Sequence, residues 1–229
     1  MINFLRNIKP INLRFYTDNP NVYELLKPDK SSRFIPSWLG SLKTVDRKPT
    51  VKNCYGLRES YRDGFIVPLW SDINIHTYLD AKGAFDLSLE FADKTHSCIF
   101  DRGNTVMHPK KQTLIKLISP WRVECDEDIT FSVYENLFSN PNRGVHFVSG
   151  ALNFKYQNSC HMFFYIQNIP DVKVQLDAGD TPMFFRQNSK RSINIQCFYD
   201  PEKTNYLINR NMNRPFFNTA MYKRKMLDG

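Results

Sequence analysis

The chain has 229 residues, of which 41% are hydrophobic and 14% aromatic, and its formal net charge is +8. This length allows one large β domain or two small ones, and the composition excludes a chain that is disordered throughout. No run of about 18 apolar residues predicts a membrane-spanning helix, and residues 1–10 lack the long apolar segment of a signal peptide. We therefore expect a folded protein that has no membrane partner.

The cysteines favour a reducing compartment. They are odd in number, widely spaced and include no Cys-x-x-Cys pair, which is typical of buried thiols. The cysteines are Cys54, Cys98, Cys125, Cys160 and Cys197. We therefore expect a cytoplasmic protein.

The positive charge is concentrated at the two ends of the chain. Residues 1–62 carry a net charge of +7 and residues 181–229 one of +6, whereas residues 63–180 carry −5. Basic ends could bind nucleic acid or an acidic protein surface. They could equally lie across the acidic middle of the same or a neighbouring subunit. This second interpretation is favoured, because no run of Lys and Arg reaches five residues.

Residues 1–52 are rich in proline, and we expect them to be irregular apart from one short helix. Asn19 and Pro20 precede Val-Tyr-Glu-Leu-Leu, so Asn19 is predicted as the N-cap and Pro20 as the first helical residue. The aromatic segment 33–39 is expected to pack over a β core, and residues 54–63 to form another helical turn.

From Phe65 onward the pattern changes to short strands. Apolar and polar residues alternate along Phe85–Phe91, which is typical of a half-buried strand. Ala81-Lys82-Gly83 predicts a hairpin turn, and Pro68 indicates a sheet edge or a bulge. The predicted strands are 65–70, 73–77, 85–91, 114–118 with a continuation at 123–125, 129–133, 145–154 and 162–166.

Residues 171–199 predict a β-meander of three short strands. Asp177-Ala178-Gly179-Asp180 separates the first two strands, and Asn188-Ser189-Lys190 separates the second from the third. Gly179 is expected in a turn conformation that a side chain would strain. The residues expected in the core are Leu176, Phe184, Ile193 and Ile195.

This number of short strands predicts a mainly β fold: an antiparallel β-sandwich or a jelly-roll-like barrel, with a few short helices and extended N- and C-terminal segments. We expect a Pro-rich, basic segment over residues 1–62 packed on the core, and a β domain over 63–199. A short helix that begins near Asp200-Pro201 and a basic tail are expected over 200–229.

Most metal and nucleophile chemistries find little support in the sequence. Among the histidines, His96 and Cys98 have ligand types at a two-residue spacing, but ordinary structural roles explain them better. No Gly-x-Ser-x-Gly motif or Gly-rich phosphate loop occurs. Asp126-Glu127-Asp128 is interpreted as a charged hairpin tip rather than a carboxylate pair. We therefore expect no metal and no cofactor.

The turn after residue 176 is the best candidate ligand site. Similar turns precede buried strands in cupins and in trimeric dUTPase-like barrels, where adjacent strands line a pocket. Its candidate binding residues are Asp177, Gly179, Asp180 and Thr181, with Arg186, Lys190 and Arg191 as candidates for binding phosphate. A purely structural turn is the favoured interpretation, and the three basic residues could equally be solvated at strand ends.

Four segments in order resemble an uncharacterised protein family of marine T4-like phages, especially cyanophages. They are Phe34-Ile35-Pro36-Ser37-Trp38, the segment 54–72, Leu117-Ile118-Ser119-Pro120-Trp121 and Gly179-Asp180-Thr181-Pro182. The family has Gly-Thr-Pro in the last segment, so Asp180 is a departure, and Val123-Glu124-Cys125-Asp126 replaces its usual turn residues. The resemblance implies a phage origin and carries over no catalytic residues.

Two functional hypotheses follow. The first is a non-enzymatic phage protein, a virion-associated structural or binding module, whose partners are other phage or host proteins or further copies of itself. The alternative is a small-molecule or nucleotide-handling enzyme on a cupin-like or dUTPase-like barrel. Nucleic acid is a less favoured partner of the basic ends. The expected location is the host cytoplasm, or the virion for a structural protein.

Overall fold

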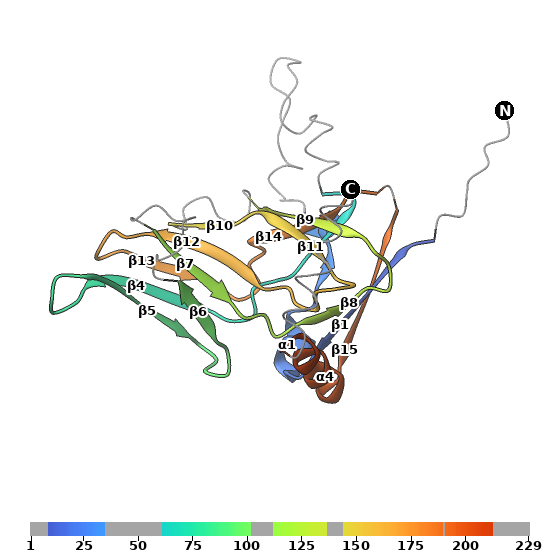
Figure 1. The fold of residues 1–229 in the computed structure, drawn as a ribbon, viewed down its shortest axis with the longest axis horizontal. Coiled ribbons are helices and arrows are strands. Elements are labelled where there is room, and N and C mark those ends of the chain that lie inside the picture. Colours follow the sequence, from blue (N-terminus) through green and yellow to red (C-terminus); the bar gives the residue numbers. More distant parts are fainter. Residues whose placement is uncertain (1–8, 35–60, 102–111, 137–143, 190, 213–229) are drawn as a thin grey trace, which may run out of the picture.

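Figure 1 shows a computed structural model of the chain, in which residues 9–34, 61–101, 112–136, 144–189 and 191–212 are described. Two of its sheets hold the centre of the fold. The β1 sheet consists of β15 (Ile193–Tyr199), β1 (Ile11–Thr17) and β8 (Arg122–Glu124), in that order. The β9 sheet consists of β11 (Gly150–Asn153), β9 (Thr130–Glu135), β14 (Met183–Gln187), β3 (Gly64–Ile66) and β2 (Asp29–Lys30).

Two further sheets lie at the left of Figure 1. The β7 sheet consists of β10 (Val145–Phe147), β12 (Met162–Gln167), β7 (Gln112–Leu117) and β6 (Cys98–Asp101). The β4 sheet consists of β13 (Lys173–Leu176), β4 (Ile73–Leu79) and β5 (Phe85–Phe91). The β1 sheet lies on the opposite side, near the helices α1 (Pro20–Leu25) and α4 (Pro201–Met212). A short 3₁₀ helix, η1 (Ser31–Phe34), follows β2.

The predicted fold class is confirmed. The chain is mainly β and sandwich-like, with few helices, and its sheets do not close into a barrel. Among the described strands, β1 and β15 form the one parallel pair, in register from Ile11 opposite Ile193 to Thr17 opposite Tyr199. The extended ends, residues 1–8 and 213–229, lie outside the described part of the chain.

The expectation that residues 1–52 are irregular is wrong for residues 11–17. Ile11, Leu13 and Phe15 are fully buried, and the residues between them are not, so β1 shows the two-residue period of a strand. The prediction of α1 is confirmed, because the Asn19 side chain accepts a hydrogen bond from the Val22 amide at 3.1 Å. Residues 35–39 and 54–60 lie outside the described part of the chain.

The predicted meander over residues 171–199 is wrong, although its three strands are present. β13 pairs with β4, β14 lies between β9 and β3, and β15 pairs with β1, so the three strands belong to three different sheets. Alternation identifies a strand locally, but long-range packing chooses its partner. The core prediction is confirmed, since Leu176, Phe184 and Ile193 are buried and Ile195 is half-buried.

The hairpin and the C-terminal helix agree with their predictions. β4 and β5 pair antiparallel around Gly83, which has a φ of +75°. Asp200 caps α4, because its Oδ1 accepts a hydrogen bond from the Lys203 amide at 2.8 Å. α4 is the longest helix among the described residues, and its 12 residues are too few to cross a membrane.

An aromatic cluster around Phe65 joins the β1 sheet to the β9 sheet. The Phe65 ring stacks on Phe185 at 4.7 Å and meets Phe15 of β1 edge-on at 5.5 Å. Phe131 and Phe154 complete its surroundings at 5.6 and 6.0 Å. Large aromatic side chains dominate core energetics, so this cluster is the centre of the hydrophobic core.

Gly64 lets β3 and β14 approach at this cluster. A Cβ atom at residue 64 would lie 2.5 Å from the Phe185 carbonyl oxygen and 3.1 Å from Ser31 Oγ. We expect Gly64→Ala to lower the free energy of unfolding by about 1–3 kcal/mol, measured by urea unfolding, because overpacking strains a core.

Gly150→Ala is the matched control, since a Cβ atom at residue 150 would meet no atom within 4 Å. That variant should stay within about 0.5 kcal/mol of the parent protein. Equal stability of the two variants would contradict the packing argument.

Candidate binding cleft

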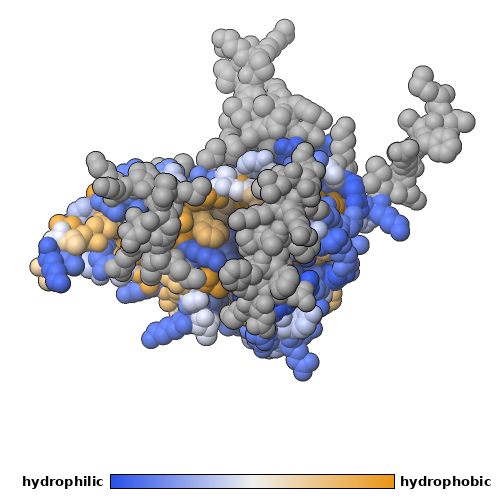
Figure 2. Space-filling model, in the orientation of Figure 1, coloured by the Kyte–Doolittle hydropathy of each residue, from blue (hydrophilic) through white to orange (hydrophobic). Residues whose placement is uncertain are grey.

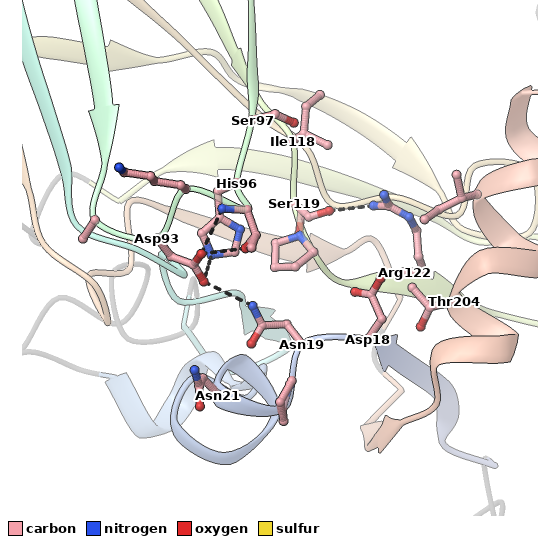
Figure 3. A pocket seen from close by; sticks show the side chains of 16 residues that line it. Asp18, Asn19, Asn21, Asp93, His96, Ser97, Ile118, Ser119, Arg122 and Thr204 are labelled. Carbon is pink, nitrogen blue, oxygen red and sulfur yellow. Dashed lines mark hydrogen bonds and ion pairs between the residues drawn. The ribbon is translucent and has the colours of Figure 1, made fainter.

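A cleft of about 810 Å³ lies where the start of α1, the loop after β5, the β7–β8 connection and α4 meet (Figure 3). Its volume is within the usual range of small-molecule sites. The cleft is lined by Asp18, Asn19, Pro20, Asn21, Ala92, Asp93, Lys94, Thr95, His96, Ser97, Ile118, Ser119, Pro120, Arg122, Thr204 and Ile208.

The loop after β5 is held by the Asp93 carboxylate. Its Oδ1 accepts hydrogen bonds from the amide and the hydroxyl of Thr95, at 2.9 and 2.7 Å. Its Oδ2 accepts a longer one, 3.4 Å, from the side-chain amide of Asn19. The bonds from Thr95, followed by the nearby His96, lower the pKa of Asp93. This carboxylate therefore ties the loop to the N-cap of α1.

His96 contributes a neutral, buried ring to the wall of the cleft. Its side chain is 5% exposed, and burial lowers its pKa, although the Asp93 and Asp18 carboxylates act in the opposite direction. The ring donates a hydrogen bond to the Trp70 carbonyl. Nε2 makes no hydrogen bond with a described residue and lies 3.5 Å from Asp93 Oδ2.

The β7–β8 connection is anchored by Trp121. This ring is fully buried and meets Phe15 edge-on at 6.2 Å. The Trp121 amide donates to Ser119 Oγ at 3.1 Å. Asn158 holds the next strand, because its side-chain amide donates to the Val123 carbonyl at 2.7 Å. The residues on either side of Trp121 are therefore fixed by the core.

Arg122 is the buried cation of the cleft. It comes directly after Trp121 in the sequence, and it is only 9% exposed. Nη1 donates to the Ser119 carbonyl at 2.6 Å and to the Trp121 carbonyl at 3.4 Å. Burial lowers the pKa of the guanidinium, and it forms no ion pair with a carboxylate of the described residues. The carbonyl dipoles of Ser119 and Trp121 balance part of its charge.

Asp18 brings a second charge without a partner. It precedes the N-cap of α1, it is exposed, and its carboxylate makes no hydrogen bond or ion pair with the described residues. Figure 3 shows this carboxylate pointing to the side of the cleft where Arg122 and Thr204 lie. Asp18 raises the pKa of Arg122 against the effect of burial, which agrees with that placement.

The turn over residues 177–181 does not line this cleft, and it is hydrogen-bonded to the core. Gly179 has a φ of +87°, as expected, and its amide donates to the Leu69 carbonyl at 2.8 Å. The Asp180 carbonyl accepts from the Leu69 amide at 2.7 Å, and Gln175 donates to the Asp177 carboxylate at 2.7 Å. Thr181 is bound by Asn136 through its carbonyl and hydroxyl, at 2.9 and 3.2 Å. These bonds dock the turn on the core.

The predicted basic cluster is not brought to that turn. Arg186 lies on β14 opposite Ser132 and Gly64, and Arg191 lies beyond the far end of that strand. Arg191 is engaged by the Glu127 carboxylate, with one contact of 2.8 Å, and by the Lys9 carbonyl at 2.8 Å. Lys190 lies outside the described residues. Arg186 and Arg191 therefore do not lie at the turn over residues 177–181.

His96 and Cys98 also take ordinary positions. Cys98 lies on β6 opposite Leu117, and burial raises the pKa of its thiol. Within the described ranges, no group of three or more His, Cys, Asp or Glu side chains could hold a metal ion. His96 belongs to the cleft, but as a wall residue hydrogen-bonded to the Trp70 carbonyl.

The interpretation of residues 126–128 as a hairpin tip is wrong. β8 and β9 flank these acids but belong to different sheets. Asp126 accepts two hydrogen bonds from Arg14, at 2.7 and 3.0 Å, and Asp128 accepts from Asn153 at 2.7 Å. The bonds with Arg14 and Arg191 lower the pKa values of Asp126 and Glu127. The acids therefore connect separate parts of the fold.

Sequence reasoning missed Asp18, Arg122 and Thr204. One available signal was the charged residue after Ser119-Pro120-Trp121, because it stands between two residues with strand character, Trp121 and Val123. No model of a known protein family matches the chain, and no curated protein matches its sequence.

His161 links the cleft to the pH dependence of stability. Its Nδ1 accepts a hydrogen bond from the Ser119 amide at 3.2 Å. Burial, together with Lys116 and Arg122, lowers its pKa to about 3, below the value of about 6.5 in an unfolded chain. Between these values the unfolded state binds the extra proton, so stability falls as the pH falls below about 6.5.

We expect His161→Asn to flatten this loss between about pH 6.5 and 4.5, before most carboxylates titrate. The Asn side-chain carbonyl can still accept the Ser119 amide, but it does not titrate. Urea unfolding across this pH range measures the slope, and His76→Asn, at an exposed position on β4, is the control. An unchanged slope in His161→Asn would show that other groups cause the loss.

Proposed function

We propose that the chain is a non-enzymatic binding module on a β-sandwich, that it is a component of a phage particle, and that the cleft holds its small-molecule ligand. The four ordered segments that resemble the family of marine T4-like phages support the phage origin. The shape and lining of the cleft support the binding role.

The observation that carries the binding role is that most polar groups of the cleft are hydrogen-bonded within the protein, whereas two charged groups are not paired. Ser119 Oγ accepts from the Trp121 amide, and the Thr204 hydroxyl donates to the Asp200 carbonyl at 2.7 Å. The Thr95 hydroxyl donates to Asp93. These groups hold loops and helix ends in place, whereas Arg122 and Asp18 remain available to a ligand. A cleft with fixed walls and two unpaired charges is better suited to binding a ligand than to catalysing its chemical reaction.

Exposed aromatic residues near the same end support attachment to another protein. Phe198 and Tyr199 on β15 are 39% and 49% exposed, and Tyr206 on α4 is 57% exposed. Aromatic residues are enriched in protein interfaces because they combine apolar area with a polar group. Figure 2 shows hydrophilic surface predominating at the end where α1 and α4 lie.

The competing proposal is an enzyme that handles small molecules or nucleotides. It rests on a cupin-like or dUTPase-like barrel, on the Gly179 turn and on the cluster of Arg186, Lys190 and Arg191. Because the sheets stay open and Arg191 is engaged by Glu127, that motivation is weaker. Turnover of a compound by the purified protein would favour it.

The cleft can be tested by filling it. Asn21 is an exposed lining residue on α1, whereas Glu24 is exposed on the same helix and does not line the cleft. We expect the parent protein, incubated with host-cell metabolite extract and re-isolated, to retain one compound unchanged, as identified by mass spectrometry. Asn21→Trp should retain at least about tenfold less, because the indole occupies the space.

Glu24→Trp is the matched control and should retain the compound like the parent. Equal retention by Asn21→Trp would place the ligand elsewhere. Consumption of a compound with release of a product would replace the binding module by an enzyme.

The particle assignment is tested by mass spectrometry of purified virions. We expect peptides of this chain in the particle, and fewer of them when Tyr206→Ser removes an exposed ring from α4. Leu79→Ser is the control, because Leu79 is 54% exposed on β4, in a different sheet. Virions without the chain would refute the particle role while leaving the binding role open to its own test.

A further inference from the structure

We propose that the ligand of the cleft is a small α-amino acid, bound through its carboxylate by Arg122 and through its ammonium by Asp18. This inference rests on the proposed binding function and names the chemistry of the ligand. It depends on two opposite charges that line one cleft without pairing with each other or with other described residues.

Arg122 offers the geometry that a carboxylate requires. Nη1 is occupied by the Ser119 and Trp121 carbonyls, which fix the plane of the guanidinium. Nε and Nη2 make no hydrogen bond with a described residue, and neither is sealed from solvent. Their parallel N–H groups form the fork that binds two carboxylate oxygens. Because Arg122 is 9% exposed, an ion pair there is less screened than one on the open surface.

Asp18 supplies the complementary charge on the solvent side. Its carboxylate has no donor among the described residues, and it faces the part of the cleft that contains Arg122 (Figure 3). The neighbouring carboxylate, Asp93, is occupied by Thr95 and Asn19. An ammonium group in the cleft would therefore find Asp18 as its free acceptor.

The charge balance of the lining favours a dipolar ligand over a simple ion. The lining contains two acids, Asp18 and Asp93, and two permanent cations, Lys94 and Arg122, so its formal charge is zero. A phosphate or dicarboxylate at Arg122 would be repelled by Asp18, and a lone amine at Asp18 would be repelled by Arg122. A molecule with both groups satisfies both charges. The remaining volume leaves room for its side chain.

The probes are the twenty common L-α-amino acids, first pooled and then individually, with binding to the full chain measured by calorimetry. We expect at least one to bind. Its amide, which lacks the carboxylate, and its N-acetyl derivative, which lacks the ammonium, should each bind at least about tenfold more weakly. Acetate, succinate and inorganic phosphate test for a plain anion site.

Asp18→Asn tests whether Asp18 binds the ammonium group of the ligand, separately from whether the cleft binds any ligand. Asp18 is exposed and makes no bond within the described structure, so the variant should fold like the parent. We expect it to bind the amino acid about tenfold more weakly, and to bind the anionic N-acetyl derivative at least as tightly as the parent does, because Asp18 no longer repels that carboxylate. Glu24→Gln removes the same charge from the exposed face of α1 outside the cleft and should have no effect. Arg122→Lys keeps the charge but lacks the fork, so it too should weaken binding.

Several outcomes would overturn the inference. They are binding of no amino acid, equal or tighter binding of phosphate or succinate, or unchanged affinity in Asp18→Asn. If one of these occurs while Asn21→Trp still abolishes retention of another compound, the cleft is a binding site for a different ligand class. If Asn21→Trp has no effect either, the proposed function of the cleft fails as well.

Discussion

The stacked pair of Phe65 and Phe185 is the interaction on which the rest of the fold depends. Their rings lie 4.7 Å apart and nearly parallel, at 4°, and Phe15 and Phe131 close around Phe65 edge-on. Each such pair contributes about 0.5–1.5 kcal/mol beyond its burial of area. Because these rings come from both the β1 sheet and the β9 sheet, the cluster fixes how the two sheets pack. Gly64 beside Phe65 makes the close approach of β3 and β14 sterically possible.

This aromatic core also determines the geometry of the cleft. Phe15 contacts Trp121, which is fully buried. In the sequence, Trp121 stands between Ser119 and Arg122. A shift of that ring would open a void in the core, so its neighbours are held in place as well. Because Trp121 is held in the core, the adjacent Arg122 is largely shielded from water. The carbonyls of Ser119 and Trp121 replace part of its hydration. The packing of the core therefore determines the geometry of the cleft.

The sequence predicted local elements well and their partners poorly. Alternation located the strands and Asn19-Pro20 located α1, because these signals depend on neighbouring residues. The sheet of β13, β14 and β15 depends on strands far away in the chain, and no local pattern specifies them. β1 was missed because prolines flank it, at Pro10 and Pro20, and proline-rich context indicates irregular backbone, although the segment itself alternates. The cleft was missed for a similar reason, since its lining extends from residue 18 to residue 208.

The cleft differs from the β8–β9 connection in how its charged side chains are paired. Around the β8–β9 connection, Arg14 pairs with Asp126 at 2.7 Å, Lys203 with Glu124 at 3.0 Å, and Arg191 with Glu127. Those pairs are partly exposed, where an unpaired charge would cost little. Arg122 is far more buried and has no such partner in the part of the chain that the structure describes, although a buried charge without one is expensive. Leaving Arg122 without a partner therefore costs more than leaving any of those three pairs unmade. In our proposal, the carboxylate of the ligand supplies to Arg122 what Asp126 supplies to Arg14.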